Sequence, residues 1–197
     1  SDPMTYWNEK IETMPKEDLK AMQLELLKEL VKNTYRDSKF YRERMDAAGV
    51  KPEDIKTLDD IRKLPFMKKT DLRDNYPDKL FVRPYDDLVR IHVSSGTTGK
   101  PTVVGYTRND LDNWAESLDR GMVSFGMSKS DMLQNAHGYG LFTGGIGVHD
   151  AATRLGATVL PVSTGNTNRQ IDLMCDLPVT AIAGTPSYLF HIADTCD

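Results

Sequence analysis

Hydrophobic residues follow two different periods along the chain, and the change between them divides it into two parts. In the first third, hydrophobic positions recur at steps of three and four among Lys, Glu and Gln, at Leu19, Met22, Leu26 and Leu30. This spacing is typical of an amphipathic helix that carries these side chains on one face. A second helix is predicted over residues 40–48, and Gly49 suits the left-handed position that ends it.

Two short helical turns are predicted next, over residues 57–60 and 70–74. Each begins with a hydroxyl side chain that suits the N-cap, Thr57 and Thr70, and each carries carboxylates in its first turn. We therefore expect a helical N-terminal region over residues 4–80.

From residue 87 the period shortens to two. Val89, Ile91 and Val93 alternate with polar residues, which predicts a half-buried strand. A second strand is expected over residues 103–106. Thr107 then suits the cap of a long helix that Gly126 ends, with one apolar face made by Leu111, Trp114, Ala115, Leu118, Met122 and Phe125.

The remainder alternates strands with helices. Strands are predicted over residues 132–136, 157–162 and 179–183, and helices over 145–155, over 168–176 and from Thr185-Pro186 onward. Thr167 and Gln170 have the spacing of a capping box for the second of these helices. This alternation predicts an α/β fold with part of a mostly parallel sheet and flanking helices, over residues 81–197. Ligands bind such sheets at the C-terminal ends of the strands.

One loop at a strand end concentrates the residues that bind phosphate. The hydroxyl–glycine loop, residues 94–102, holds five Ser or Thr, two Gly and one Lys in nine positions. Glycines let backbone N–H groups converge on an anion, hydroxyls add donors, and Lys100 adds a charge. The glycine spacing and Pro101 after the lysine exclude the P-loop of kinases and small GTPases. The alternative interpretation is a flexible hairpin tip.

A second unusual stretch is the aromatic–glycine segment, residues 137–147, in which five of eleven residues are glycine. Glycines at a helix start allow a ligand to approach the backbone, and the helix N-terminus favours an anion such as a carboxylate. Tyr139 and Phe142 are candidate walls of an aryl pocket, or else core filler. His137 has two interpretations, a role beside a bound ligand or a structural one.

Charge and composition narrow the class of partner. Lys and Arg number 25 against 29 Asp and Glu, a net charge of −4, which argues against nucleic-acid binding. No apolar run approaches the length of a membrane span. Cys175 and Cys196 show no disulfide or metal-knuckle pattern, and the spacing fits reduced thiols in the cytoplasm. His92, His149 and His191 are expected to be structural or solvated, and no metal-binding residue is predicted.

The sequence Ser94-Ser95-Gly96-Thr97-Thr98-Gly99-Lys100-Pro101 resembles the signature loop of the adenylate-forming enzymes. Other stretches resemble the phenylacetate–CoA ligase branch of that superfamily. They are residues 64–66, 69–73 and 76–77 upstream, and Asn135, residues 139–145, 155–157 and 184–188 downstream.

This resemblance implies a two-step reaction in which an aryl acid is first adenylated by ATP and then transferred to coenzyme A. It implies that Ser94, Ser95, Gly96, Thr97, Thr98, Gly99 and Lys100 bind the nucleotide phosphates, with Thr97 and Lys100 catalytic. It favours an acid pocket formed by Tyr139, Phe142, Gly144, Gly145 and Val148. Mg²⁺ is expected with ATP, on ligands outside these 197 residues, and a homodimer is a family expectation.

The segments that contact adenine and ribose in this family, and its C-terminal lid, have no counterpart here. We therefore expect an incomplete N-terminal domain of an adenylate-forming enzyme, inactive alone, with residues 1–3 ahead of Met4 a cloning remnant. The alternative function is a non-catalytic module that binds a nucleotide or anion.

Overall fold

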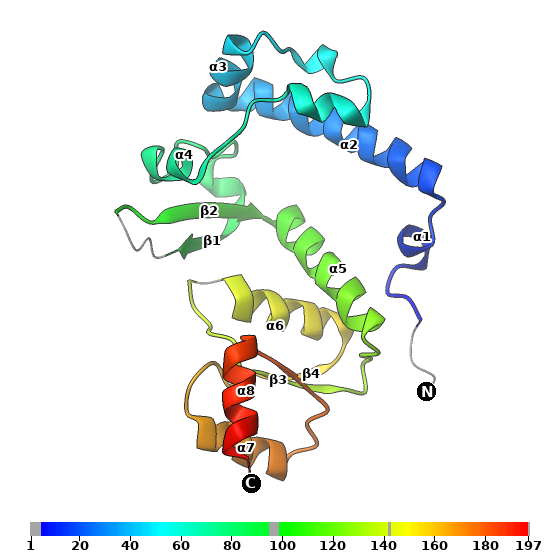
Figure 1. Cartoon of the computed structure of the whole chain (residues 1–197), viewed down its shortest axis with the longest axis vertical. Helices are drawn as coiled ribbons and strands as arrows, with labels where there is room; N and C mark the ends of the chain where they lie inside the picture. Colours follow the sequence, from blue (N-terminus) through cyan, green and yellow to red (C-terminus); the bar gives the residue numbers. More distant parts are fainter. Residues whose placement is uncertain (1–4, 95–98, 142, 197) are drawn as a thin grey trace. The chain divides into compact units, whose positions relative to one another are not determined.

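The computed structural model describes residues 5–94, 99–141 and 143–196, and the chain forms two compact units (Figure 1). Residues Glu9–Thr107 make up the N-terminal unit. The C-terminal unit begins at Arg108 and includes the N-terminal residues up to Asn8. The predicted domain division near residue 80 stays a prediction. The hairpin of residues 88–107 belongs to the N-terminal unit, since its second strand packs on a helix of that unit.

Helices make up most of the N-terminal unit. They are α1 (Glu9–Glu12), α2 (Lys16–Asp37), α3 (Lys39–Ala47), η1 (Pro52–Asp54), η2 (Leu58–Lys63), α4 (Lys69–Asp74) and η3 (Tyr85–Asp87). Their core is formed by Val31, Met45, Val50 and Ile55. Gly49, with a φ of 70°, follows α3 as predicted.

The buried face of α2 is displaced by one residue from the predicted one. Leu26 and Leu30 are 56% and 63% exposed, whereas Leu27 and Val31 pack in the core. The spacing therefore identified the helix correctly but not its inward face. That face is decided by α3 and the segment after it, which pack against Val31.

The prediction that Thr70 caps a helix is wrong, because α4 begins at Lys69. The carboxylate of Asp71 accepts a hydrogen bond from the Lys68 N–H at 2.7 Å, and this contact starts the helix. Asp71 also forms a two-pronged ion pair with Arg44 of α3, at 2.6 and 2.9 Å. The hydrogen bonds from Arg44 are the main reason that the pKa of Asp71 lies below its usual value.

Two antiparallel strands, β1 (Leu88–Ser94) and β2 (Thr102–Thr107), complete this unit. They confirm that the hydroxyl–glycine loop joins two strands. The buried side of β1 is not the valine side, however. Val89 and Ile91 are 48% and 37% exposed, whereas His92 is buried and packs edge to face on Tyr106, with ring centroids 5.5 Å apart.

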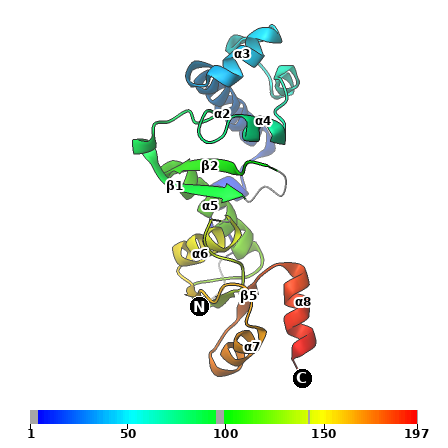
Figure 2. The same ribbon diagram turned by 90° about the vertical axis from the view of Figure 1, so that its left-hand side faces the viewer.

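The C-terminal unit is an α/β layer structure. Its elements are α5 (Arg108–Ser124), β3 (Met132–Asn135), α6 (Thr143–Leu155), β4 (Thr158–Leu160), α7 (Thr167–Asp176), β5 (Ala181–Ala183) and α8 (Pro186–Thr195). The three strands are parallel in the order β4-β3-β5, which confirms the predicted parallel sheet. Figures 1 and 2 show α5 and α6 on one side of this sheet and α7 on the other.

Two local predictions for this unit are wrong. Asn166, not Thr167, caps α7 by accepting a hydrogen bond from the Arg169 N–H. Gln170 is fully buried and accepts a hydrogen bond at 2.6 Å from the amide of Gln134 in β3, so its side chain serves the sheet rather than the cap. Phe125, expected on the buried face of α5, is 90% exposed.

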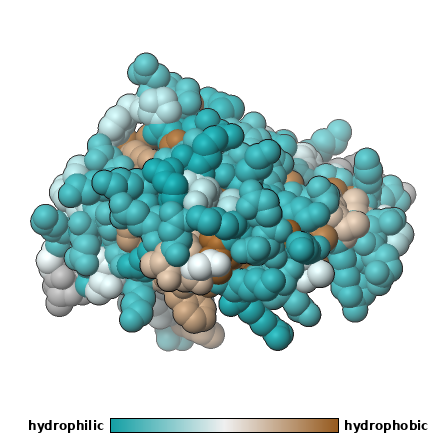
Figure 3. Space-filling model, turned by 90° about the horizontal axis from the view of Figure 1, so that it is seen from above, coloured by the Kyte–Doolittle hydropathy of each residue, from teal (hydrophilic) through white to brown (hydrophobic). Residues whose placement is uncertain are grey.

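The surface seen in Figure 3 is mostly hydrophilic, with apolar side chains in separate patches. Among the described residues, no helix combines the length and the hydrophobicity needed to cross a lipid bilayer.

Candidate functional site

The hydroxyl–glycine loop is closed at its base by a contact between the two strands that it joins. Ser94 lies opposite Thr102 in the ladder, and the hydroxyls of these two residues are hydrogen-bonded. Ser95, Gly96, Thr97 and Thr98 lie outside the described residues.

The end of this loop presents a lysine to solvent. Gly99 has a φ of 107°, a left-handed conformation that glycine adopts without strain. Lys100 follows it and is exposed, with its Nζ 5.9 Å from the centre of the Tyr76 ring. No described carboxylate pairs with Lys100.

Asn135 organises the aromatic–glycine segment from the C-terminal end of β3. It is fully buried, and its amide donates 2.8 Å hydrogen bonds to the Tyr139 hydroxyl and to the carbonyl oxygen of Gly145. Its side-chain oxygen accepts a hydrogen bond from the His137 N–H. One side chain thus connects the strand end, the loop and the first turn of α6. The sequence marked Asn135 only as part of a family pattern; the available signal was a polar residue at a strand end.

Tyr139 is held in place by two side chains. Besides its bond to Asn135, its hydroxyl lies 3.1 Å from the Nδ1 atom of His149, and the two rings pack edge to face. Burial, with a smaller effect of the nearby Asp150 carboxylate, raises the pKa of Tyr139 above its usual value. The contacts with Asn135 and His149 therefore fix the orientation of the Tyr139 ring.

The two glycines at the start of α6 are in different surroundings. A Cβ atom at Gly145 would lie 2.2 Å from the carbonyl oxygen of Gly138, so the loop backbone leaves no room for a side chain. A Cβ atom at Gly144 would meet only His137, at an ordinary 3.6 Å. Close packing of the loop on the helix therefore requires glycine at 145 but not at 144.

Two further candidates for the acid pocket are Phe142 and Val148. Phe142 lies outside the described residues. Val148 is half-buried and lines a hollow of about 490 Å³ together with residues of α5, β3 and β5, among them Met122, Leu133 and Ala181. Tyr139, Gly144 and Gly145 do not line that hollow, so the part of Val148 in an acid pocket stays a prediction.

No three His, Cys, Asp or Glu side chains of the described residues lie close enough together to hold a metal ion. Cys175 and Cys196 are both free and exposed.

Known proteins resemble this chain both in sequence and in fold. No family model matches the chain. It is 50% identical over 184 residues to the phenylacetate-coenzyme A ligase of Escherichia coli, and 51% identical to that of Thermus thermophilus. Each alignment covers 93% of this chain, but only 42% and 41% of the respective relatives, so the chain spans about two fifths of their length.

Solved structures of 2-hydroxyisobutyryl-CoA ligase share the fold. One, in complex with 2-HIB-AMP and CoA in the thioesterification state, superimposes with a TM-score of 0.91 at 30% identity. The superposition covers 97% of this chain and 42% of the chain in that structure. An open conformation of the same ligase gives a TM-score of 0.90 at 29% identity.

These similarities extend over nearly all of the chain and confirm the resemblance that the sequence patterns predicted. Over nearly all of its length, the chain is thus similar to about two fifths of the phenylacetate-coenzyme A ligases.

Proposed function

We propose that this chain supplies the phosphate-binding loop and the aryl-acid pocket of a ligase that joins phenylacetate, or a related aryl acid, to coenzyme A at the expense of ATP. The observation that carries the proposal is the 50% identity to the Escherichia coli enzyme over 184 residues. Lys100, which is exposed at the end of the hydroxyl–glycine loop and pairs with no described carboxylate, agrees with it.

In the first step a carboxylate oxygen of the acid attacks the α-phosphorus of ATP, and pyrophosphate leaves. Residues 94–100 hold the β- and γ-phosphates, and Thr97 and Lys100 stabilise the negative charge that grows on the leaving group. In the second step the thiol of coenzyme A attacks the acyl carbonyl of the adenylate and loses its proton, and AMP leaves.

Tyr139, Phe142, Gly144, Gly145 and Val148 are proposed to receive the acid. The network around Asn135 supports this, because it holds the Tyr139 ring and the start of α6 in fixed positions. A rigid wall of this kind places a carboxylate near its target with little loss of entropy on binding.

Mg²⁺ is proposed to accompany ATP and to neutralise phosphate charge when bound. From the resemblance to adenylate-forming enzymes, we propose that its ligands lie outside these 197 residues. A cytoplasmic location, homodimer formation and the absence of nucleic-acid and membrane partners belong to the same proposal.

Exchange of labelled pyrophosphate into ATP, dependent on phenylacetate, tests this proposal. It is measured on the protein encoded by the whole reading frame that contains these 197 residues. Lys100→Ala should slow exchange by about a hundredfold to a thousandfold, the usual effect of removing one donor to developing charge. Lys79→Ala, at another exposed lysine of the same unit, should leave the rate unchanged.

Nucleotide binding without any acid-dependent exchange, over a panel of aryl acids, would contradict the ligase proposal and favour the non-catalytic binding module. Equal exchange rates in Lys100→Ala and the unaltered protein would contradict the assignment of the loop.

A further inference from the structure

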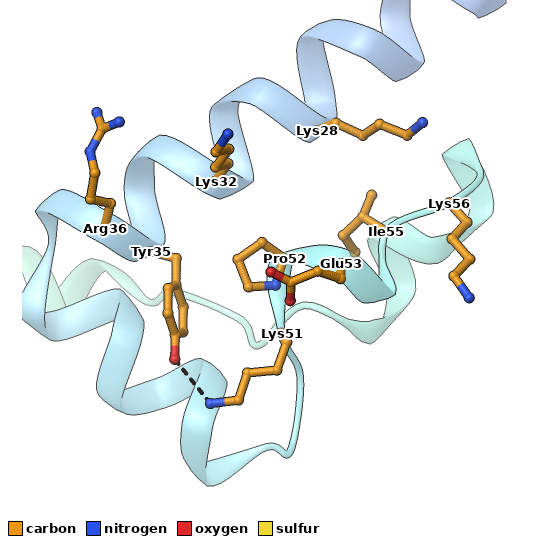
Figure 4. Close-up of a pocket in the computed structure, with 9 residues that line it drawn as sticks. All are labelled: Lys28, Lys32, Tyr35, Arg36, Lys51, Pro52, Glu53, Ile55 and Lys56. Carbon is orange, nitrogen blue, oxygen red and sulfur yellow. Dashed lines mark hydrogen bonds between the residues drawn. The ribbon is translucent and has the colours of Figure 1, made fainter.

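A second concentration of positive charge lies in the N-terminal unit, in a hollow of about 780 Å³ (Figure 4). This basic hollow is lined by Lys28, Lys32, Tyr35, Arg36, Lys51, Pro52, Glu53, Ile55 and Lys56. Five of these nine side chains are cationic and one is anionic, in a chain whose net charge is −4. It shares no residue with the hydroxyl–glycine loop.

The cations come from both walls of the hollow. Lys28, Lys32 and Arg36 project from one face of α2, four residues apart, and Lys51 and Lys56 come from the segment around η1 (Figure 4). Like charges at this spacing on a helix repel one another. An anion bound between the walls would remove that repulsion.

Two of the five cations have no carboxylate partner among the described residues. Lys28 pairs with Glu25, Arg36 with Asp37, and Lys51 with Asp46. Lys32 and Lys56 form no ion pair with any described residue, and both are exposed. Long lysine side chains at the rim can turn onto a ligand without a change in the backbone.

The remaining lining offers apolar and aromatic surface. Pro52 is half-buried and supplies the apolar part, whereas Ile55 behind it is 2% exposed and belongs to the core. The hydroxyl of Tyr35 accepts a hydrogen bond from the Lys51 amine at 2.9 Å, and that amine also lies 2.5 Å from an Asp46 oxygen. Hydrogen bonds to Asp46 and to Tyr35 raise the pKa of Lys51, which therefore keeps its charge at neutral pH.

We propose that the basic hollow is a binding site for a small molecule that carries at least two phosphate groups. Lys28 and Arg36 are eight residues apart on α2, a rise of about 12 Å, so one phosphate group reaches only some of the cations. Two linked phosphates extend over more of these cations than one does, and a nucleotide can also place its base on Tyr35 and Pro52. The concave shape favours a small molecule over a flat anionic surface.

Calorimetry on the 197-residue chain, at low ionic strength and with neither acid nor coenzyme A present, tests this site separately from ligase activity. The probes are inorganic pyrophosphate, ADP and orthophosphate. Pyrophosphate and ADP should bind at least about tenfold more tightly than orthophosphate, because charge-assisted contacts add with each phosphate. Tighter binding of ADP would identify a nucleotide as the ligand, and tighter binding of pyrophosphate an inorganic one.

The double variant Lys32→Glu, Lys56→Glu should weaken binding of both diphosphates by at least about tenfold. The milder Lys32→Gln, Lys56→Gln should weaken it in the same direction, and it covers the case in which charge reversal disturbs folding. The matched control is Lys16→Glu, Lys20→Glu, which makes the same charge change at two exposed lysines of α2 outside the hollow. Lys100→Ala removes the lysine of the hydroxyl–glycine loop, so the diphosphate binding that this variant keeps is not due to that lysine.

Three results would overturn the proposal. The first is the absence of diphosphate binding in the unaltered chain, and the second is an equal loss in the control, which would indicate a general charge effect. The third is binding to phosphatidylserine vesicles that the double variant abolishes, with no binding of pyrophosphate or ADP; that outcome would indicate a membrane-facing patch.

Discussion

Asp119→Asn should raise the free energy of unfolding of the C-terminal unit, and the gain should increase as the pH rises from 5 to about 7 and then stay constant up to pH 9. Asp119 lies on α5 and is fully buried. Neither of its side-chain oxygens accepts a hydrogen bond in the described structure, and the nearest cation, Nε of Arg154, is 3.9 Å from Oδ2. A charged carboxylate in that position is costly.

Burial is the main cause that raises the pKa of Asp119 to about 7. The charge of Arg154 opposes this rise, and the charge of Glu116 adds to it. Glu116 is itself held by hydrogen bonds from Trp7 and Asn8, at 2.7 and 2.9 Å, and Arg120 lies near it on the same helix. Arg154 and Glu116 therefore act on Asp119 through their charges, but no described group donates a hydrogen bond to its carboxylate.

The direction of the effect follows from the two pKa values. Well below pH 4 the carboxyl group is protonated in both the folded and the unfolded chain, so no penalty exists. As the pH rises, the carboxyl group of Asp119 ionises first in the unfolded chain. The folded state therefore loses stability until the pH passes about 7. The change from 3.8 to about 7 corresponds to at most about 4 kcal/mol at alkaline pH. Asparagine does not titrate and avoids this loss.

Urea unfolding at several pH values, followed by tryptophan fluorescence, measures the effect. Both tryptophans of the chain, Trp7 and Trp114, lie in the same unit as Asp119. Asp112→Asn is the control, because it makes the same change at an exposed position of α5. A stability difference that does not vary with pH would show that the carboxyl group of Asp119 is not the titrating group.

Gly145→Ala should destabilise the C-terminal unit by about 1–3 kcal/mol, the range for overfilling a packed site. Its Cβ atom would lie 2.2 Å from the Gly138 oxygen, and this oxygen belongs to the backbone and cannot rotate away. The loop that carries Tyr139 would have to move. In the proposed ligase, such a movement would also disturb the acid pocket.

Gly144→Ala is the matched control at the neighbouring position. A methyl group there has an ordinary contact with His137, and alanine favours helix over glycine by about 0.5–1 kcal/mol. The same urea titration should therefore show Gly144→Ala unchanged or slightly stabilised. If the two variants unfolded at the same urea concentration, the contact between Gly145 and Gly138 would not restrict this position.

Much of the fold follows from periodicity in the sequence. The three-to-four spacing of residues 19–30 predicted α2, and the alternation after residue 130 predicted the parallel sheet. Both are local patterns, because a helix or strand repeats its faces over a few residues whatever lies beside it. The two candidate ligand segments were likewise visible as runs of Gly, Ser, Thr and aromatic residues, and the family pattern came with them.

Which face of α2 and of β1 is buried could not be read in this way. Leu27 and Val31, rather than Leu26 and Leu30, meet the core of the N-terminal unit, and His92, rather than Val89, lies on the inner side of β1. Periodicity states which residues share a face, but the partner that covers that face comes from a distant part of the chain.

The buried polar side chains also separate what the sequence determines from what the tertiary structure decides. The sequence by itself determined the types of the elements, their order and the resemblance to phenylacetate–CoA ligases. Only the tertiary structure decided that Gln170 bonds to Gln134, 36 residues away, that Asn135 connects Tyr139 to Gly145, and that Asp119 is enclosed. The physical reason is that a polar side chain is stable in the interior only when distant segments bring it a partner, and no local pattern records which segments those are.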